Sequence, residues 1–254
     1  MAGKVIGIGV GPGDPELITV KAVKALKTAD VICVPKAHAD TPSMALAMVK
    51  HILQERESLP EVLELVFPMT KDELGLKRAW AANANIVAER AKNGETVAFI
   101  TLGDPMFYST FVYLCQSMKE ECPDVRLEII PGITSLTACA ASSKVPLAEK
   151  NEAVAVIPSA FDPKQIGEIA KYADNLVFMK GAQRLKELVP ILKNSGFTEN
   201  STVALVRRCT MPEENVIVGK LGDVQNWDIH EDYFSMTILK KKELQRNLKQ
   251  SDVL

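Results

Sequence analysis

Gly7-Ile-Gly9-Val-Gly11-Pro-Gly13-Asp14-Pro15 lies near the N-terminus. It begins within a short aliphatic run and continues past the end of that run. Glycine lets two backbone segments approach closely and accepts positive φ angles, so the segment indicates a strand that ends in a tight loop. The loop differs from the G-x-G-x-x-G loop that binds dinucleotides, because Pro12 intervenes and two carboxylates follow that would repel a pyrophosphate. A tight turn without any ligand is the alternative that this segment alone leaves open.

Short apolar runs alternate with helical patterns from this loop to residue 130. The expected strands are Lys4–Val10, Val31–Val34, Val62–Phe67, Val97–Thr101 and Leu127–Ile130, and the expected helices are Thr19–Lys27, Ser43–Gln54, Lys71–Asn93 and Phe107–Lys119. Strands separated by helices pair in parallel through right-handed crossovers. Continuously apolar strands are typical of a sheet that is covered on both faces.

The pattern changes after a short expected helix at Thr134–Ser142. The later expected strands are Val154–Ile157, Leu176–Met179, Thr202–Arg207, Val216–Gly219 and Tyr233–Lys240, and no long helix separates the last three. Strands that follow one another in this way usually pair antiparallel. We therefore expect two α/β domains, an N-terminal one at 1–140 with a parallel sheet and a C-terminal one at 141–254 with a mixed sheet.

Composition excludes several classes of protein. The 254 residues are 47% apolar and carry a formal net charge of −2, which argues against nucleic acid as a partner. The five cysteines are widely spaced and form no C-x-x-C, which argues against a disulfide framework or a zinc site and fits a reducing compartment. The N-terminus does not resemble a signal peptide, and no apolar run reaches the ~20 residues that span a bilayer. We expect a cytoplasmic protein without a membrane partner.

A second motif, Thr101-Leu102-Gly103-Asp104-Pro105-Met106-Phe107-Tyr108-Ser109-Thr110, follows the fourth expected strand. Ligands of open parallel sheets bind beyond the carboxyl ends of the strands. Gly103 permits close approach there, and Asp104 supplies an acceptor for a ribose hydroxyl or an amino group. The alternative is that Asp104-Pro105 only begins the next helix, with Pro105 in its first turn.

Two further segments end strands in the same way. Ile130-Pro131-Gly132-Ile133-Thr134-Ser135 opens a helix, and either Thr134 or Ser135 is suited to cap it, which is the simpler explanation of that segment. Phe178-Met179-Lys180-Gly181 ends a strand of the second domain. Met179 is typical of a hydrophobic core, although a thioether also packs well against an adenine ring.

In this order, the motifs GxGPGDPxLxTxKAxxxLxxAD, GDPMFYST, IPGITS and FMK resemble the tetrapyrrole methylase family, which includes uroporphyrinogen and precorrin methyltransferases and diphthine synthase. Each motif is weak alone, but together they extend over essentially the whole chain. Segments 62–70, 102–110, 145–147 and 232–235 are similar to the branch of the family that methylates C20 of precorrin-2 or cobalt-factor II in cobalamin synthesis.

The resemblance implies a homodimer whose subunits hold S-adenosylmethionine folded between their two domains and release S-adenosylhomocysteine. By position, the cofactor contacts implied by the family are Pro12, Leu102, Gly103, Asp104, Phe107, Thr110, Thr134, Ser135, Met179, Arg208 and Thr237. The pair Arg207-Arg208 departs from the acidic or small residue that many relatives carry near the adenine pocket.

Methyl transfer from a sulfonium needs alignment of the reactants and exclusion of water, not a dedicated nucleophile or a protein-bound metal. A base must remove the meso proton, and the alternatives are Asp104, Tyr108 or a carboxylate of the substrate itself. No histidine spacing resembles a metal site, so we expect no metal bound by the protein.

The acetate and propionate groups of a tetrapyrrole require cations and backbone donors. Cationic or polar side chains in suitable segments are Lys36, His38, Lys144, Lys180, Arg207 and Arg208. We expect substrate contacts from Lys36, which follows a parallel strand directly, and also from His38 and Tyr108. A solvated surface charge is the alternative for each cation.

Two other functions remain open at this stage. One is a methyltransferase of the same fold that acts on a macromolecule, either a diphthine-type protein target or ribosomal RNA. The other is a non-catalytic module that binds S-adenosylmethionine without turnover. The sequence does not reveal whether the macrocycle must already contain cobalt, although overall likeness favours the cobalt form.

Overall fold

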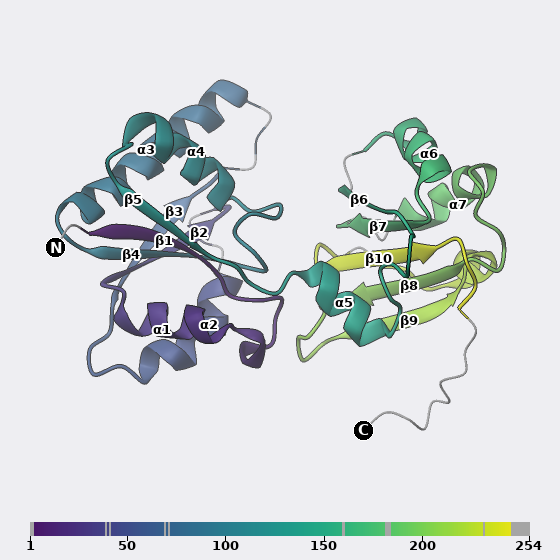
Figure 1. Ribbon diagram of the computed structural model, residues 1–254, viewed down its shortest axis with the longest axis horizontal. Helices are drawn as coiled ribbons and strands as arrows, with labels where there is room; N and C mark the ends of the chain where they lie inside the picture. The colour runs from purple at the N-terminus through teal and green to yellow at the C-terminus, as the bar shows by residue number, and fades with distance from the viewer. Residues whose placement is uncertain are drawn as a thin grey trace. The chain divides into compact units, whose positions relative to one another are not determined.

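The computed structural model describes residues 3–38, 40, 42–68, 70, 72–158, 161–180, 184–230 and 232–244 (Figure 1). The chain consists of two compact units, Met1–Thr134 and Ser135–Leu254. Each unit has its own five-stranded sheet covered by helices, which confirms the predicted class of two α/β domains. The predicted domain boundary after residue 140 lies later than this division, inside a helix.

The first sheet is entirely parallel, with strand order β3-β2-β4-β1-β5. Its strands are β1 Lys4–Gly9, β2 Val31–Lys36, β3 Glu61–Val66, β4 Thr96–Thr101 and β5 Arg126–Ile130. The helices are α1 Val20–Thr28, α2 Met44–Gln54, α3 Glu73–Lys92 and α4 Phe111–Glu121, with a 3₁₀ turn η1 at Pro15–Leu17. Helices α1 and α2 cover one face of the sheet, and α3 and α4 cover the other (Figure 1).

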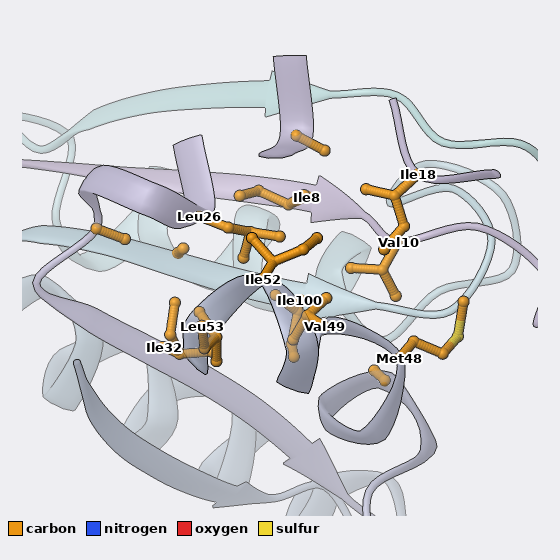
Figure 2. Close-up of a cluster of buried hydrophobic side chains, with 14 of the residues drawn as sticks. Ile8, Val10, Ile18, Leu26, Ile32, Met48, Val49, Ile52, Leu53 and Ile100 are labelled. Atoms are coloured by element: carbon orange, nitrogen blue, oxygen red, sulfur yellow. The ribbon is translucent and has the colours of Figure 1, made fainter. Parts of the chain in front are cut away.

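Figure 2 shows the core between the sheet and the helices α1 and α2. Ile8 from β1 and Ile100 from β4 pack with Leu26 of α1 and Ile52 of α2, and all four side chains are buried. Burying such a side chain contributes about 1.5–3 kcal/mol. Because this core fixes strands β1 and β4 side by side, it also fixes the loops that leave their carboxyl ends.

Side-chain caps set where the helices of this face begin. The Thr19 hydroxyl accepts a hydrogen bond from Ala22 N, and the Ser43 hydroxyl accepts one from Leu46 N. Each satisfies a backbone donor that has no partner within its helix.

The strand order of the first sheet has a switch point between the neighbouring strands β1 and β4. The connection after β1 leads to β2 on one side, whereas the connection after β4 leads to β5 on the other. Adjacent strands whose connections leave in opposite directions form a crevice at their carboxyl ends, which is where open α/β sheets bind ligands. The glycine-rich loops after β1 and β4 both lie at this point.

Three backbone segments meet there without room for side chains. A Cβ on Gly132 would lie 2.1 Å from the carbonyl oxygen of Gly103 and 2.8 Å from the backbone of Gly9. A Cβ on Gly9 would lie 2.5 Å from the same Gly103 oxygen. We call Gly9, Gly103 and Gly132 the glycine junction.

Two of the differences from the expected boundaries have a clear physical cause. Strand β2 continues through Pro35 to Lys36, because its pairing with β4 ends at Cys33 and the missing N–H of proline breaks no hydrogen bond there. Helix α4 begins at Phe111 instead of Phe107, because Tyr108 has a φ of +51° that no helix accepts. Pro105 therefore does not lie in the first turn of α4.

The second sheet is mixed, as predicted, with order β6-β7-β10-β8-β9 and only β6 and β7 parallel. Its elements are α5 Ser135–Ser143, β6 Val154–Pro158, α6 Pro163–Tyr172, β7 Asn175–Met179, α7 Leu185–Asn194, β8 Thr202–Arg207, β9 Asn215–Lys220, η3 Leu221–Asn226 and β10 Ser235–Lys240. Helices α6 and α7 pack on one face, and α5 packs against β8, β9 and β10.

A buried ion pair ties the segment after α5 to this sheet. The Lys240 side chain is 0% exposed and donates to Glu152 Oε2 at 2.8 Å and to the Pro146 carbonyl at 3.1 Å. Glu152 also accepts from Asn175 Nδ2 at 2.9 Å. The hydrogen bonds from Lys240 and Asn175 lower the pKa of Glu152 to about 2.

We predict that Glu152→Gln destabilises the protein by about 3 kcal/mol at neutral pH, because it leaves the buried Lys240 ammonium with only the exposed carboxylate of Glu149, 3.9 Å away. The Glu152 pKa is lower in the folded state than the value of about 4.3 in unfolded chains. The stability it contributes is therefore complete above that pH and is lost as the pH falls towards 2. Urea unfolding at several pH values measures both effects.

The matched control is Glu168→Gln, which removes an exposed pair with Lys171 on α6. That change should cost less than about 1 kcal/mol. Equal losses in the two variants would contradict a stabilising role for the buried pair.

We also predict that Gly132→Ala destabilises the first unit by about 2–3 kcal/mol, because backbone atoms of the junction cannot move away from a new Cβ. In the control Gly222→Ala, the atom nearest to the new Cβ is Glu199 Oε2 at the end of a flexible side chain. Thermal unfolding compares the two, and a Gly132→Ala protein as stable as the wild type would show that the junction tolerates a side chain.

Candidate cofactor site

The loops after β1 and β4 are joined by backbone hydrogen bonds at the glycine junction. Gly103 N donates to Gly11 O at 2.7 Å, and Gly11 N donates to Gly103 O at 3.4 Å. Gly11 and Gly103 have φ angles of +86° and +65°, which only glycine adopts readily. Pro12, a predicted cofactor contact, is buried next to this bridge.

Asp104 fastens this pair of loops to the loop after β5. Its Oδ2 accepts from Gly132 N at 3.0 Å and its Oδ1 accepts from Met106 N at 2.8 Å. Each carboxylate oxygen thus receives a backbone N–H. The geometry gives Asp104 a positioning role at the edge of the sheet, in addition to the acceptor role expected from the sequence.

An added Cβ would fit beside Gly103 at ordinary contact distances, unlike beside Gly132. A Cβ on Gly103 would meet no atom closer than the Cα of Thr134, at 3.9 Å. Leu102, Gly103 and Asp104 are each partly exposed, so this stretch of backbone is accessible. The predicted contacts Leu102, Gly103, Asp104 and Thr134 therefore lie together at one edge.

The turn from Pro105 to Thr110 presents the remaining predicted residues of the first unit. Ser109 anchors it: its hydroxyl lies 2.9 Å from that of Thr101 and accepts from Phe111 N at 3.1 Å. Tyr108 is 52% exposed, and its ring packs edge-on against Phe107 at 4.9 Å. A non-glycine residue with positive φ is uncommon, and such strain often marks ligand sites.

The structure gives Lys36 a partner that the sequence did not predict. Lys36 is the last residue of β2, its side chain is only 8% exposed, and its Nζ lies 2.9 Å from Glu64 Oε2 on β3. Glu64 was missed because the parallel register of β2 and β3 cannot be derived from one sequence. His38 lies two positions later and is exposed.

The predicted cofactor residues of the second unit do not form one cluster. Thr237 is opposite Phe178 in the β7–β10 ladder, so the next residue, Met179, points to the other face of the sheet. Thr237 is 1% exposed, and its hydroxyl has no hydrogen-bond partner within the described structure. Ser135, the first residue of α5, also belongs to this unit.

Arg208 follows β8 with a φ of +48°. Its Nε donates to Asp232 Oδ2 at 2.9 Å, and this bond raises the pKa of Arg208. Burial acts to raise the pKa of Asp232, but the hydrogen bonds from Arg208 and Phe234 N outweigh it and lower that pKa. Arg207 donates separately to Asn215 at 2.7 Å.

The edge of the first sheet fits a ligand that needs backbone contact and a carboxylate-bearing loop, and S-adenosylmethionine is such a ligand. Leu102, Gly103 and Asp104 are partly exposed at this edge, which allows a ligand to approach their backbone. Within the described ranges, no group of three or more His, Cys, Asp or Glu side chains is arranged to hold a metal ion. The same part of the chain contains no helix long and apolar enough to cross a membrane.

Comparison with known proteins gives the family. The model of the tetrapyrrole (corrin/porphyrin) methylases matches residues 4–225. A probable cobalt-precorrin-2 C(20)-methyltransferase of Methanocaldococcus jannaschii is 37% identical over 94% of this chain and 96% of its own. The cobalt-precorrin-2 C(20)-methyltransferase of Salmonella typhimurium is 35% identical over 84% of this chain and 87% of its own. A precorrin-2 C(20)-methyltransferase of Sinorhizobium sp is 32% identical over 93% and 95%.

Solved structures show the same fold at lower identity. A cobalt precorrin-4 methyltransferase superposes with a TM-score of 0.69 at 24% identity, covering 93% of this chain and 94% of that one. The uroporphyrin-III C-methyltransferase of Thermus thermophilus, solved with S-adenosylhomocysteine, gives a TM-score of 0.65 at 23% identity over 94% and 97%. The family model and the relatives together show that this chain belongs to the tetrapyrrole methylase family.

Proposed function

We propose that this chain transfers one methyl group from S-adenosylmethionine to C20 of a precorrin-2 type tetrapyrrole in cobalamin biosynthesis. The carbon position rests on the three relatives, which are all named for C20 methylation at 32–37% identity. The single structural observation that supports a methyltransferase is the glycine junction at the switch point of the parallel sheet. The backbone beside it, at Leu102 and Gly103, is partly exposed and suits the approach of a cofactor.

A cobalt-containing macrocycle is the proposed substrate. The relatives at 37% and 35% identity are named for cobalt-precorrin-2, whereas the one at 32% is named for precorrin-2. In this proposal the cobalt arrives in the substrate, and His38, a proposed substrate contact, is exposed two positions after the end of β2. Composition and family resemblance support a cytoplasmic homodimer that works without nucleic acid or a membrane.

S-adenosylmethionine supplies an activated methyl group on a sulfonium. The backbone of Leu102 and Gly103 would line it, and Pro12, Phe107, Thr110 and Thr134 would border it in the first unit. Asp104 holds the loops after β4 and β5 together before the ligand binds. Preorganisation of this kind lowers the cost of aligning two reactants. Ser135, Met179, Arg208 and Thr237 are the proposed contacts in the second unit.

Of the three alternatives for removing the meso proton, two are side chains of this protein, and their surroundings differ. Both oxygens of Asp104 are occupied by backbone donors. Tyr108 is half-exposed and held in a strained turn, which places its phenol where a substrate can reach it. We therefore assign contact with the substrate to Tyr108 and positioning of the loops to Asp104.

Lys36 is the proposed anchor for a substrate carboxylate. In the protein alone, Glu64 pairs with the Lys36 ammonium and keeps it at the carboxyl end of β2. A propionate of the macrocycle carries the same charge as Glu64 and would share or replace that contact. Glu64 is half-exposed, so it can move aside without leaving a buried charge unpaired.

The direct test is anaerobic incubation with S-adenosylmethionine and either cobalt-sirohydrochlorin or metal-free precorrin-2, followed by mass spectrometry. We expect one methyl group to be gained on the cobalt macrocycle. Gain on precorrin-2 alone would keep the reaction and change the preferred substrate. No gain on either, with the cofactor still bound, would contradict the proposal and direct attention to macromolecular targets or to a sensor.

A second prediction concerns the cofactor. Asp104→Ala should raise the Kd for S-adenosylmethionine about tenfold, the effect of losing about 1.4 kcal/mol, because the backbone donors of Gly132 and Met106 lose their acceptor. The control Asp124→Ala removes an exposed carboxylate of the same unit and should leave the Kd unchanged. Calorimetric titration measures both, and equal affinities in the two variants would remove Asp104 from the cofactor site.

A further inference from the structure

Residues 232–235 form a short segment that ends at the first residue of β10, the central strand of the second sheet. Two backbone hydrogen bonds hold it from either side: Lys180 N donates to Ser235 O at 2.9 Å, and Arg208 N donates to Phe234 O at 2.8 Å. Asp232 fixes its start, accepting from Phe234 N and from Arg208 Nε at 2.9 Å each. The segment is therefore rigidly positioned.

The two residues that hold this segment are both in the left-handed region. Lys180 follows β7 with a φ of +57°, and Arg208 follows β8 with a φ of +48°. Neither is a glycine, and strained residues of this kind persist mainly where a site over-determines them. Since β10 lies between β7 and β8, both turns lie at the same end of the sheet as the start of β10.

An exposed aromatic ring and a cation meet on this segment. Tyr233 is 53% exposed, and the Lys180 Nζ lies 4.7 Å from the centre of its ring. Arg208 forms an ion pair with Asp232, and Arg207 donates a hydrogen bond to Asn215. Within the ranges that the structure describes, no ion pair to a carboxylate is found for Lys180.

We propose that Lys180 and Tyr233 form a recognition subsite for the tetrapyrrole. The Lys180 ammonium would bind one acetate or propionate group, and the Tyr233 ring would pack against the conjugated macrocycle. A cation beside an aromatic face suits a planar ligand with an acidic rim. Arg208 and Asp232 act as positioning residues, because their bond fixes the segment that carries Tyr233.

This inference rests on the proposed function and names residues that contact the macrocycle. The subsite adjoins residues assigned to the cofactor, because Met179 directly precedes Lys180 and is opposite Met236 in the ladder. The cofactor also has a carboxylate that Lys180 could bind. The experiment therefore titrates the macrocycle and the cofactor product separately, each in the absence of the other.

The test uses the full chain and two variants, Lys180→Met and Tyr233→Leu. Cobalt-sirohydrochlorin is titrated by its absorption spectrum without cofactor, and S-adenosylhomocysteine is titrated by calorimetry without macrocycle. We expect Lys180→Met to raise the macrocycle Kd about tenfold, the loss expected for one hydrogen bond to a charged group. Tyr233→Leu should raise it about fivefold. Affinity for S-adenosylhomocysteine should not change.

Two matched controls lie in the same unit. Lys241→Met removes another lysine that lies over a ring, with its Nζ 5.5 Å from the centre of Phe197. Tyr172→Leu removes a tyrosine on α6 that is 84% exposed. Neither should change the macrocycle Kd, and Lys180→Arg should keep most of the affinity. In steady-state assays, Lys180→Met should raise KM and leave kcat nearly unchanged.

An unchanged macrocycle Kd in both variants would overturn the subsite. So would a change confined to S-adenosylhomocysteine, which would assign Lys180 to the cofactor. Wild-type protein that binds S-adenosylhomocysteine but not the macrocycle would contradict the proposed function itself, and that result appears before any variant is made. Thermal unfolding of each variant separates loss of the subsite from loss of the fold.

Discussion

The close packing of three backbone segments at the carboxyl edge of the parallel sheet is the constraint on which the first unit depends. Gly9, Gly103 and Gly132 approach so closely that a Cβ on Gly9 or Gly132 would overlap backbone atoms. The strand order brings these segments together, because β4 and β5 flank β1. The loops that leave the three strands consequently share one rigid surface.

Hydrogen bonds from side chains around this junction hold the neighbouring loops in place. Asp104 connects two of the loops through their backbone N–H groups. The bond between Thr101 and Ser109 fixes the turn that holds Tyr108 in its strained conformation. A surface arranged before the ligand arrives suits a reaction that depends on alignment more than on acid–base chemistry.

Much of the fold could be predicted from the sequence, because strand–helix alternation and glycine-rich strand ends are local signals. The parallel sheet, the mixed sheet and the position of Gly103 and Asp104 after β4 all follow from them. The start of α4 could not be predicted, since the left-handed Tyr108 is imposed by packing of the turn. The pair Lys36–Glu64 was missed because it depends on the register of two strands, which one sequence does not contain.

The second unit shows a further limit of sequence reasoning. Lys240 is the last residue of an expected strand, and its side chain is fully buried against Glu152, which is 88 positions away in the chain. Met179 and Thr237 are both motif positions, but the pleat of the sheet sends them to opposite faces. Contacts between distant segments decide such details, and only the three-dimensional structure contains them.

A crystal structure with S-adenosylhomocysteine tests the central claim most directly, namely that the glycine junction is the cofactor site. We predict that the ligand contacts the backbone of Leu102 and Gly103 and lies beside Asp104 and Thr134. A ligand bound away from the carboxyl edge of the first sheet, with the space beside Gly103 empty, would contradict it.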